Sequence, residues 1–178
     1  LNGKIGGPSV KPYMPPGIWR SISNASYKQD KGGKLYRRGM YTYWRRTVPP
    51  PTMMTFNAAA REFCTVRTDL TTTPLQALTM MNNKTFVEAS RFLAERMMRP
   101  KGQGPRQRVA EAFRRVTSRT PREAELDLLM NDFWFYQKDF QKNPKAAKRL
   151  LSVGEKPRDS KQPTAQLAAY TLVANTLL

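Results

Sequence analysis

Residues 106–129 read RQRVAEAFRRVTSRTPREAELDLL and contain the two clearest helix signals of the chain. In the first half of this stretch, apolar residues recur at i, i+3, i+4 and i+7, the spacing of one helix face: Val109, Ala112, Phe113 and Val116. In the second half, Thr120 precedes Pro121 and Glu123, which predicts an N-cap, a first helical position and a capping-box partner. We therefore expect two successive helices, the second beginning at Pro121 and reaching about Phe140.

The same reasoning predicts four more helices: residues 74–81, 84–98, 144–151 and 163–178. Thr73 and Asn143 each precede a proline, so each is expected to cap the helix that follows it. Strand signals are scarce, and no segment repeats another. The predicted fold class is therefore mainly α, an irregular multi-helix domain with a Pro/Gly-rich, loop-dominated N-terminal third.

The N-terminal third shows no regular pattern. Its glycines and prolines favour an extended arm anchored by Tyr13 and Trp19. The run KLYRRGMYTYWRR at 34–46 fits either a helix weakened by Gly39 or a strand, and we favour the helix. The prolines that begin at Pro49 end that element.

We interpret residues 1–178 as a single-domain fragment with three segments: an extended arm (1–33), a signature-motif region (34–100) and a helical region (101–178). The chain starts with Leu1 rather than Met, and its last segment is still apolar at Leu178. Both features indicate truncation at the two ends. No apolar run approaches the ~20 residues of a membrane-spanning helix, so none is predicted.

Positive charge dominates the composition, because 31 lysines and arginines face 13 acidic residues and leave a net charge of +18. Such a charge indicates a polyanionic partner or a cationic exported surface. The aromatic–basic run within 34–46 supplies polyanion-binding candidates, namely Arg37, Arg38, Tyr41, Trp44, Arg45 and Arg46. The alternative is an ordinary amphipathic element with rings inward and arginines outward.

The sequence contains few residues of the types that catalytic and metal sites use. The chain has no histidine and one cysteine, which excludes a histidine-based triad, a zinc cluster and a haem attachment motif within it, and we predict no metal and no cofactor here. Cys64 is expected to be a small buried hydrophobe. Arg61 and Glu62 stand among apolar residues, so we expect a buried pair near the helix at 74–81.

A series of motifs gives the chain a family resemblance. The motifs LYRR, YTYWRRTVPPP, MMTF, REFC, TPLQAL and FVEASRFLAER follow one another between Leu35 and Arg96, and SRTPREAEL and SVGEKPRD come later. The chain closely resembles the C-terminal planctomycete-specific domain of unknown function found in planctomycete cytochrome-C-like multidomain proteins. The resemblance implies an exported, periplasmic or similar location, upstream domains in the same polypeptide, and haem c elsewhere in the parent protein.

The resemblance also marks signature positions in this sequence: Arg61, Glu62, Cys64, Arg67, Thr73, Pro74, Gln76 and Asn82. Three neighbours depart from the family pattern. Asn57 stands where the family usually has Asp, Ala59 where it usually has Pro, and Thr68 where it usually has a second basic residue. A family role for that Asp as a catalytic or metal-binding carboxylate would be impaired here.

The leading functional hypothesis is an accessory C-terminal module of unknown activity that positions an exported parent protein on polyanionic envelope material or polysaccharide. One rival is a hydrolytic or redox site around residues 61–82, completed by upstream domains. The other is a nucleic-acid-binding module that uses residues 34–46 and 106–119. Its phosphate contacts would come from arginines.

Overall fold

The computed structural model describes residues 1–22, 26–68 and 70–178. The predicted mainly α class with a loop-rich N-terminal third is confirmed. Contacts divide the chain into two compact units, Leu1–Thr79 and Met80–Leu178. These bounds differ from the segments drawn from the sequence, and a single domain over 1–178 stays a prediction.

The first unit is built mainly from loops, and its helical segments are short: α1 (Ile18–Ile22), η1 (Gly32–Lys34), η2 (Gly39–Tyr41), α2 (Pro51–Thr55) and the start of α3 (Pro74–Asn82). Two isolated parallel bridges, Asn2 with Arg37 and Val10 with Thr42, join the arm to the later chain. The buried apolar residues of this unit are Val10, Trp19, Leu35 and Val48. With so few long elements, bridges and aromatic contacts hold its parts together.

The helix favoured for residues 34–46 is wrong. Within this run the structure has the end of η1, the single turn η2 and bridging positions at Arg37, Thr42 and Arg45. Aromatic and β-branched residues have weak helix propensity, and Gly39 lowers it further. The run instead consists of turns and isolated bridges, and Arg37 and Thr42 pair with the N-terminal arm.

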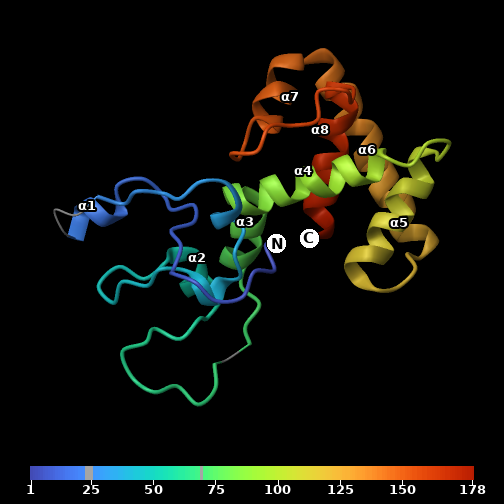
Figure 1. The fold of residues 1–178 in the computed structure, drawn as a ribbon. Helices are drawn as coiled ribbons and strands as arrows, with labels where there is room; N and C mark the ends of the chain where they lie inside the picture. The colour runs from blue at the N-terminus through green and yellow to red at the C-terminus, as the bar shows by residue number, and fades with distance from the viewer. Residues whose placement is uncertain (23–25, 69) are drawn as a thin grey trace. The chain divides into compact units, whose positions relative to one another are not determined.

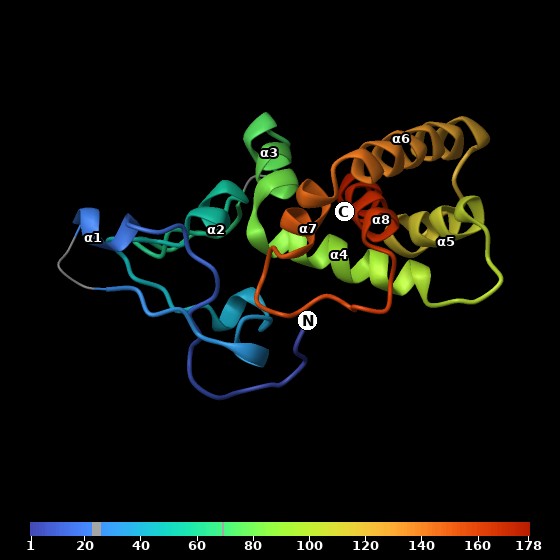
Figure 2. The same ribbon diagram turned by 90° about the horizontal axis from the view of Figure 1, so that it is seen from above.

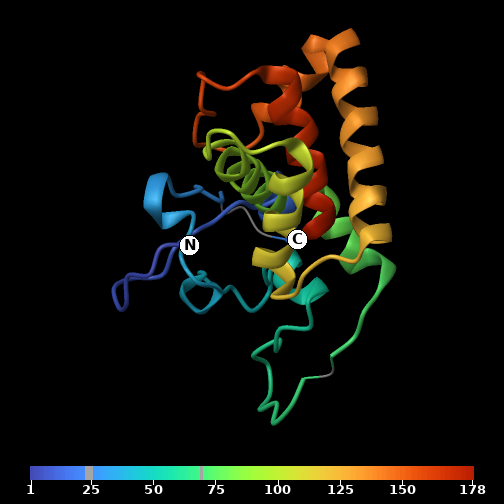
Figure 3. The ribbon, with the colours of Figure 1, turned by 90° about the vertical axis from the view of Figure 1, so that its right-hand side faces the viewer.

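The second unit is a five-helix bundle: α4 (Lys84–Met98), α5 (Pro105–Thr117), α6 (Glu123–Lys142), α7 (Pro144–Leu151) and α8 (Thr164–Leu177). Helix α8 packs against the other four and most extensively against α4 and α6. The long α6 runs beside α8 (Figures 1 and 3), and α4 lies on another side of α8 (Figure 2). Because α8 reads TAQLAAYTLVANTL, it is apolar around most of its circumference and suits this central position.

Apolar side chains from all five helices form one core around α8. Phe133 of α6 and Tyr170 of α8 are both fully buried, with ring centroids 4.4 Å apart. Val109, Ala112 and Phe113 of α5 also lie in this core, as the sequence predicts. Aromatic contacts of this kind stabilise a core beyond the area that they bury.

Most predicted helix starts are confirmed. Asn143 caps α7 by accepting a hydrogen bond from the Ala146 amide at 3.3 Å. The start of α6 is wrong, because this helix begins at Glu123 rather than Pro121, with Arg122 in the N-cap position. The carboxylate of Glu125 accepts a hydrogen bond from the Arg122 amide at 2.8 Å, so Glu125 takes the place expected for Glu123.

Candidate functional site

The signature positions do not gather into one site among the described residues. Arg61, Glu62, Cys64 and Arg67 are all exposed in the loop that follows α2. The expected burial of Arg61 with Glu62, and of Cys64, is therefore wrong. The apolar neighbours that suggested a core are themselves exposed, Phe63 by 74% and Val66 by 104%. Apolar residues in a sequence are buried only where another element of the fold packs over them.

The signature residues at the start of α3 form a local hydrogen-bond network around Gln76, which is buried. Its amide oxygen accepts from the backbone of Thr73 at 2.9 Å, and Thr73 Oγ1 accepts from the Gln76 amide at 3.2 Å. The Gln76 side chain also donates to the Thr55 carbonyl at 3.0 Å. This capping box confirms Thr73 as the cap and ties the end of α2 to the start of α3. Pro74, the first residue of α3, and Asn82, its last, are both exposed.

Asn57, one of the three positions expected to depart from the family pattern, lies in the loop after α2. Asn57 has a φ of 58°, a left-handed conformation that Asn tolerates better than most residues. Its side-chain amide donates to the Thr71 hydroxyl at 2.6 Å. Asn57 therefore serves the geometry of this loop.

Part of the aromatic–basic run holds the N-terminal arm in place. The Arg37 guanidinium lies 3.8 Å from the centroid of the Tyr41 ring and donates to the Gly6 carbonyl at 2.7 Å. The Tyr41 hydroxyl accepts from the Gly6 amide at 2.9 Å. That hydrogen bond, followed by those from Arg38 and Arg37, lowers the pKa of Tyr41. These two candidates are thus already engaged within the chain.

The rest of the run stacks cations on rings. Arg45 lies 5.2 Å from the ring of the buried Trp19, and Arg61 lies 4.7 Å from the ring of Trp44. The second contact joins a signature residue to a polyanion-binding candidate. Arg38 and Arg46 are exposed. The alternative in which this run is mainly structural therefore accounts for most of its side chains.

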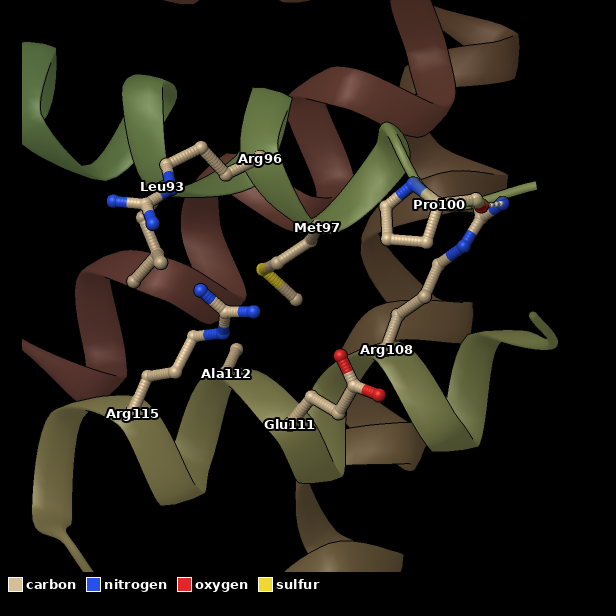
Figure 4. Close-up of a pocket in the computed structure, with 8 residues that line it drawn as sticks. All are labelled: Leu93, Arg96, Met97, Pro100, Arg108, Glu111, Ala112 and Arg115. Atoms are coloured by element: carbon tan, nitrogen blue, oxygen red, sulfur yellow. Dashed lines mark hydrogen bonds between the residues drawn. The ribbon is translucent and has the colours of Figure 1, made fainter.

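A small open pocket in the second unit, between α4 and α5, brings together charges that the sequence keeps apart (Figure 4). It has room for about one water molecule. Its lining residues are Leu93, Arg96, Met97, Pro100, Arg108, Glu111, Ala112 and Arg115. Three guanidinium groups and one carboxylate thus surround a partly apolar floor.

Two of these charged groups are held by neighbours. Arg108 donates to the Pro100 carbonyl at 3.3 Å, and Glu111 accepts from the Gln103 side chain at 2.7 Å. Arg108 also faces the hydroxyl end of Tyr170, whose pKa is raised by burial against the opposing effect of that cation. Within residues 1–22, 26–68 and 70–178, no carboxylate lies within 4.0 Å of the guanidinium of Arg96 or Arg115.

The arginines of this pocket could accommodate an anion, because arginine forks match the oxygens of sulfate, phosphate and carboxylate groups. Among the described residues, no group of three Cys, Asp or Glu side chains gathers as a metal site. No helix in that part of the chain combines the length and the apolar character needed to cross a membrane.

Comparison with known protein families gives a match over residues 1–133 of the 178, to PSD1, a protein of unknown function (DUF1553). The chain belongs to this family. No curated protein and no solved structure matches it. In this PSD1 chain the matched region includes all the signature positions and the whole α4–α5 pocket.

The pocket was missed by sequence reasoning, although its arginines stand in helices that were predicted correctly. The basic face of α5 was recognised as a candidate polyanion site at 106–119. That basic face lies near Arg96 because α4 packs against α5 in the PSD1 chain. The spacing of residues along a helix shows only which residues share a face of that helix, so it could not predict this contact.

Proposed function

We propose that this PSD1 chain is a non-catalytic accessory module that binds anionic polymers, most suitably sulfated or carboxylated polysaccharide of a cell envelope. Its parent would be an exported, planctomycete cytochrome-C-like protein with haem c in an upstream domain. The chain's one cysteine and lack of histidine do not suit covalent haem attachment within this module. Attachment to the polymer is the role that we propose for the module itself.

The carrying observation is the large excess of positive charge that remains after internal pairing. Even if each of the 13 acidic residues neutralised one cation, 18 of the 31 lysines and arginines would remain. Fewer cations than this are neutralised in the structure, because Arg91 forms ion pairs with both Glu88 and Glu95. Arg106 likewise forms ion pairs with two carboxylates of α6, those of Glu123 and Asp127. The unneutralised cations attract polyanions over about a Debye length, roughly 8–10 Å at physiological salt.

A dense group of these cations lies at the junction of α6 and α7. Residues 138–149 hold five exposed basic side chains and a single acid, Asp139: the cations are Lys138, Lys142, Lys145, Lys148 and Arg149. Those of α7 follow one another at i, i+3 and i+4, which places them on one helix face. The buried Ala147 and Leu151 fix the opposite face against the core. We call these five residues the α6–α7 basic patch.

A salt series tests the proposal on the full chain. Affinity for a heparin-like polysaccharide is expected to fall steeply with added salt, because each neutralised site releases about one counterion. Lys142→Gln/Lys145→Gln/Lys148→Gln should weaken binding and reduce the salt slope. Arg37→Gln/Arg38→Gln/Arg45→Gln/Arg46→Gln removes more charge, yet Arg37 and Arg45 are engaged inside the chain. Its effect per charge should therefore be smaller.

The outcomes separate the rivals. Binding that does not change with salt, or no binding at low salt, contradicts the proposal. A strong preference for single-stranded nucleic acid over polysaccharide at matched charge density would favour the nucleic-acid alternative, because bases add stacking energy that a sulfated sugar lacks. Circular dichroism of each variant checks that the helices are retained.

A further inference from the structure

Two arginines from different helices share the α4–α5 pocket, and in the described residues neither guanidinium has a carboxylate within 4.0 Å. Arg96 lies in the last turn of α4 and Arg115 in the last turn of α5. In Figure 4 the Arg115 guanidinium reaches from α5 toward Met97, and the Arg96 guanidinium lies beside Leu93. Like charges repel, so a shared pocket is favourable when an anion occupies it.

The only acid that lines this pocket is kept away from both arginines. Glu111 stands one turn before Arg115 on α5, a spacing that commonly forms an ion pair. Its carboxylate instead accepts a hydrogen bond from Gln103 at 2.7 Å. Arg108 is fixed by the Pro100 carbonyl at 3.3 Å. The third guanidinium is therefore held in position before any ligand arrives.

We propose that this pocket binds one tetrahedral oxyanion, a sulfate or phosphate monoester group. Guanidinium groups that line a pocket from two helices suit oxygens directed in three dimensions better than the planar pair of a carboxylate. The proposal rests on the proposed function, since the oxyanion would be one substituent of the bound polymer.

The size and floor of the pocket agree with a terminal group. Its free space holds about one water molecule and the pocket is open to solvent, so the substituent would enter only in part, with one or two oxygens inside and the polymer outside. Leu93, Met97 and Ala112 provide an apolar floor, and Met97 and Ala112 are buried. An apolar floor lowers the local dielectric constant and strengthens the attraction between the anion and the arginines.

The test uses inorganic sulfate and inorganic phosphate as probes, titrated into the full chain at low ionic strength. Backbone amide shifts of Met97 and Ala112 report occupancy, and calorimetry gives the affinity. Arg96→Gln/Arg115→Gln should weaken binding by at least about tenfold, since each lost charged hydrogen bond is worth that much or more. Arg99→Gln/Arg114→Gln is the matched control, because it removes two exposed arginines outside the pocket, one at the C-cap of α4 and one in α5. It should leave the affinity nearly unchanged.

A charge-conserving variant separates geometry from charge. Arg96→Lys/Arg115→Lys keeps both positive charges but loses the planar forks, so it should weaken binding less than the glutamine pair and more than the control. Equal weakening by the glutamine pair and its control would show that binding follows net charge and would overturn the site. The absence of a saturable shift in the unaltered chain would overturn it as well.

These outcomes are distinct from failure of the proposed function. Polymer binding without saturable sulfate or phosphate binding removes the pocket and leaves the accessory polyanion-binding module standing. Saturable oxyanion binding without any polymer binding supports the pocket and contradicts the proposed function.

Discussion

The guanidinium of Arg91 donates a hydrogen bond to the backbone carbonyl of Lys156 at 2.5 Å, across 65 residues of sequence. Lys156 returns a hydrogen bond from its amide to the Glu88 carboxylate at 3.0 Å. Glu95 accepts from the Asp159 amide at 3.2 Å and lies 3.3 Å from Arg91. One buried arginine and two buried glutamates of α4 thus fasten the loop between α7 and α8.

The first prediction concerns Arg91→Met. The variant leaves two carboxylates buried without their cation, and we expect the free energy of unfolding to fall by about 3–5 kcal/mol. Denaturant melts measure this loss. Hydrogen exchange at the amides of Lys156 and Asp159 should also become faster, because both donate to the stranded glutamates.

The control for this prediction is Arg99→Met, the same substitution at the exposed C-cap of α4. Its effect should stay within about 0.5 kcal/mol. A triple variant, Glu88→Gln/Arg91→Met/Glu95→Gln, removes all three charges and should be more stable than Arg91→Met alone. If Arg91→Met and Arg99→Met melt alike, the buried network does not contribute as described.

The second prediction concerns Gly154, which lies in the fastened loop with a φ of 99°. A Cβ at this position would lie 2.3 Å from Cδ of Glu88. Gly154→Ala therefore combines left-handed strain with a clash against a buried ion-pair partner. We expect a loss of about 2–5 kcal/mol in the free energy of unfolding, from the strain and overpacking together.

Gly102→Ala separates these two causes. Gly102 also has a positive φ, of 81°, but a Cβ there would meet nothing within 4 Å. Strain alone should cost about 1–2 kcal/mol at this position. Equal losses for the two alanine variants, measured by denaturant melts, would contradict the contact between Gly154 and Glu88.

The network around Arg91 is a feature of α4 that could not be predicted from the sequence. The helix bounds at 84–98 are confirmed. Apolar periodicity marks candidate core positions on a helix, and it does not show whether a charged residue of the same helix is buried. Glu88, Arg91 and Glu95 are nevertheless buried, because a loop from another part of the chain covers them and supplies backbone partners. Only tertiary structure provides those partners.

The opposite error occurred at Arg61, Glu62 and Cys64. Their apolar neighbours suggested burial, yet no element covers this loop in the described structure, and all three residues are exposed. Thr73 was predicted correctly as a cap because capping depends on a few adjacent residues. The Thr-x-x-Gln spacing that pairs it with Gln76 was present in the sequence as a signal and was not used.

The last prediction concerns the start of α6, where Arg119 makes two hydrogen bonds to the Glu125 carboxylate, at 2.7 and 2.8 Å. These bonds, followed by that from the Arg122 amide, lower the pKa of Glu125 from 4.5 to about 2. Because the folded pKa is the lower one, the stabilisation is fully present above pH 4.5 and is lost as the pH falls toward about 2. Glu125→Gln should therefore be less stable than the unaltered chain at neutral pH, and the difference should shrink through this window.

Arg119→Gln removes the largest cause of the shift, so it should raise the pKa of Glu125 and make this pH dependence smaller. Carboxyl-carbon NMR titration gives the pKa, and denaturant melts across the same window give the free energies. The pair lies at the surface, so added salt should weaken the effect. A difference between the unaltered chain and Glu125→Gln that stays constant from neutral pH down to about pH 2 would show that the Arg119 pair does not stabilise the fold.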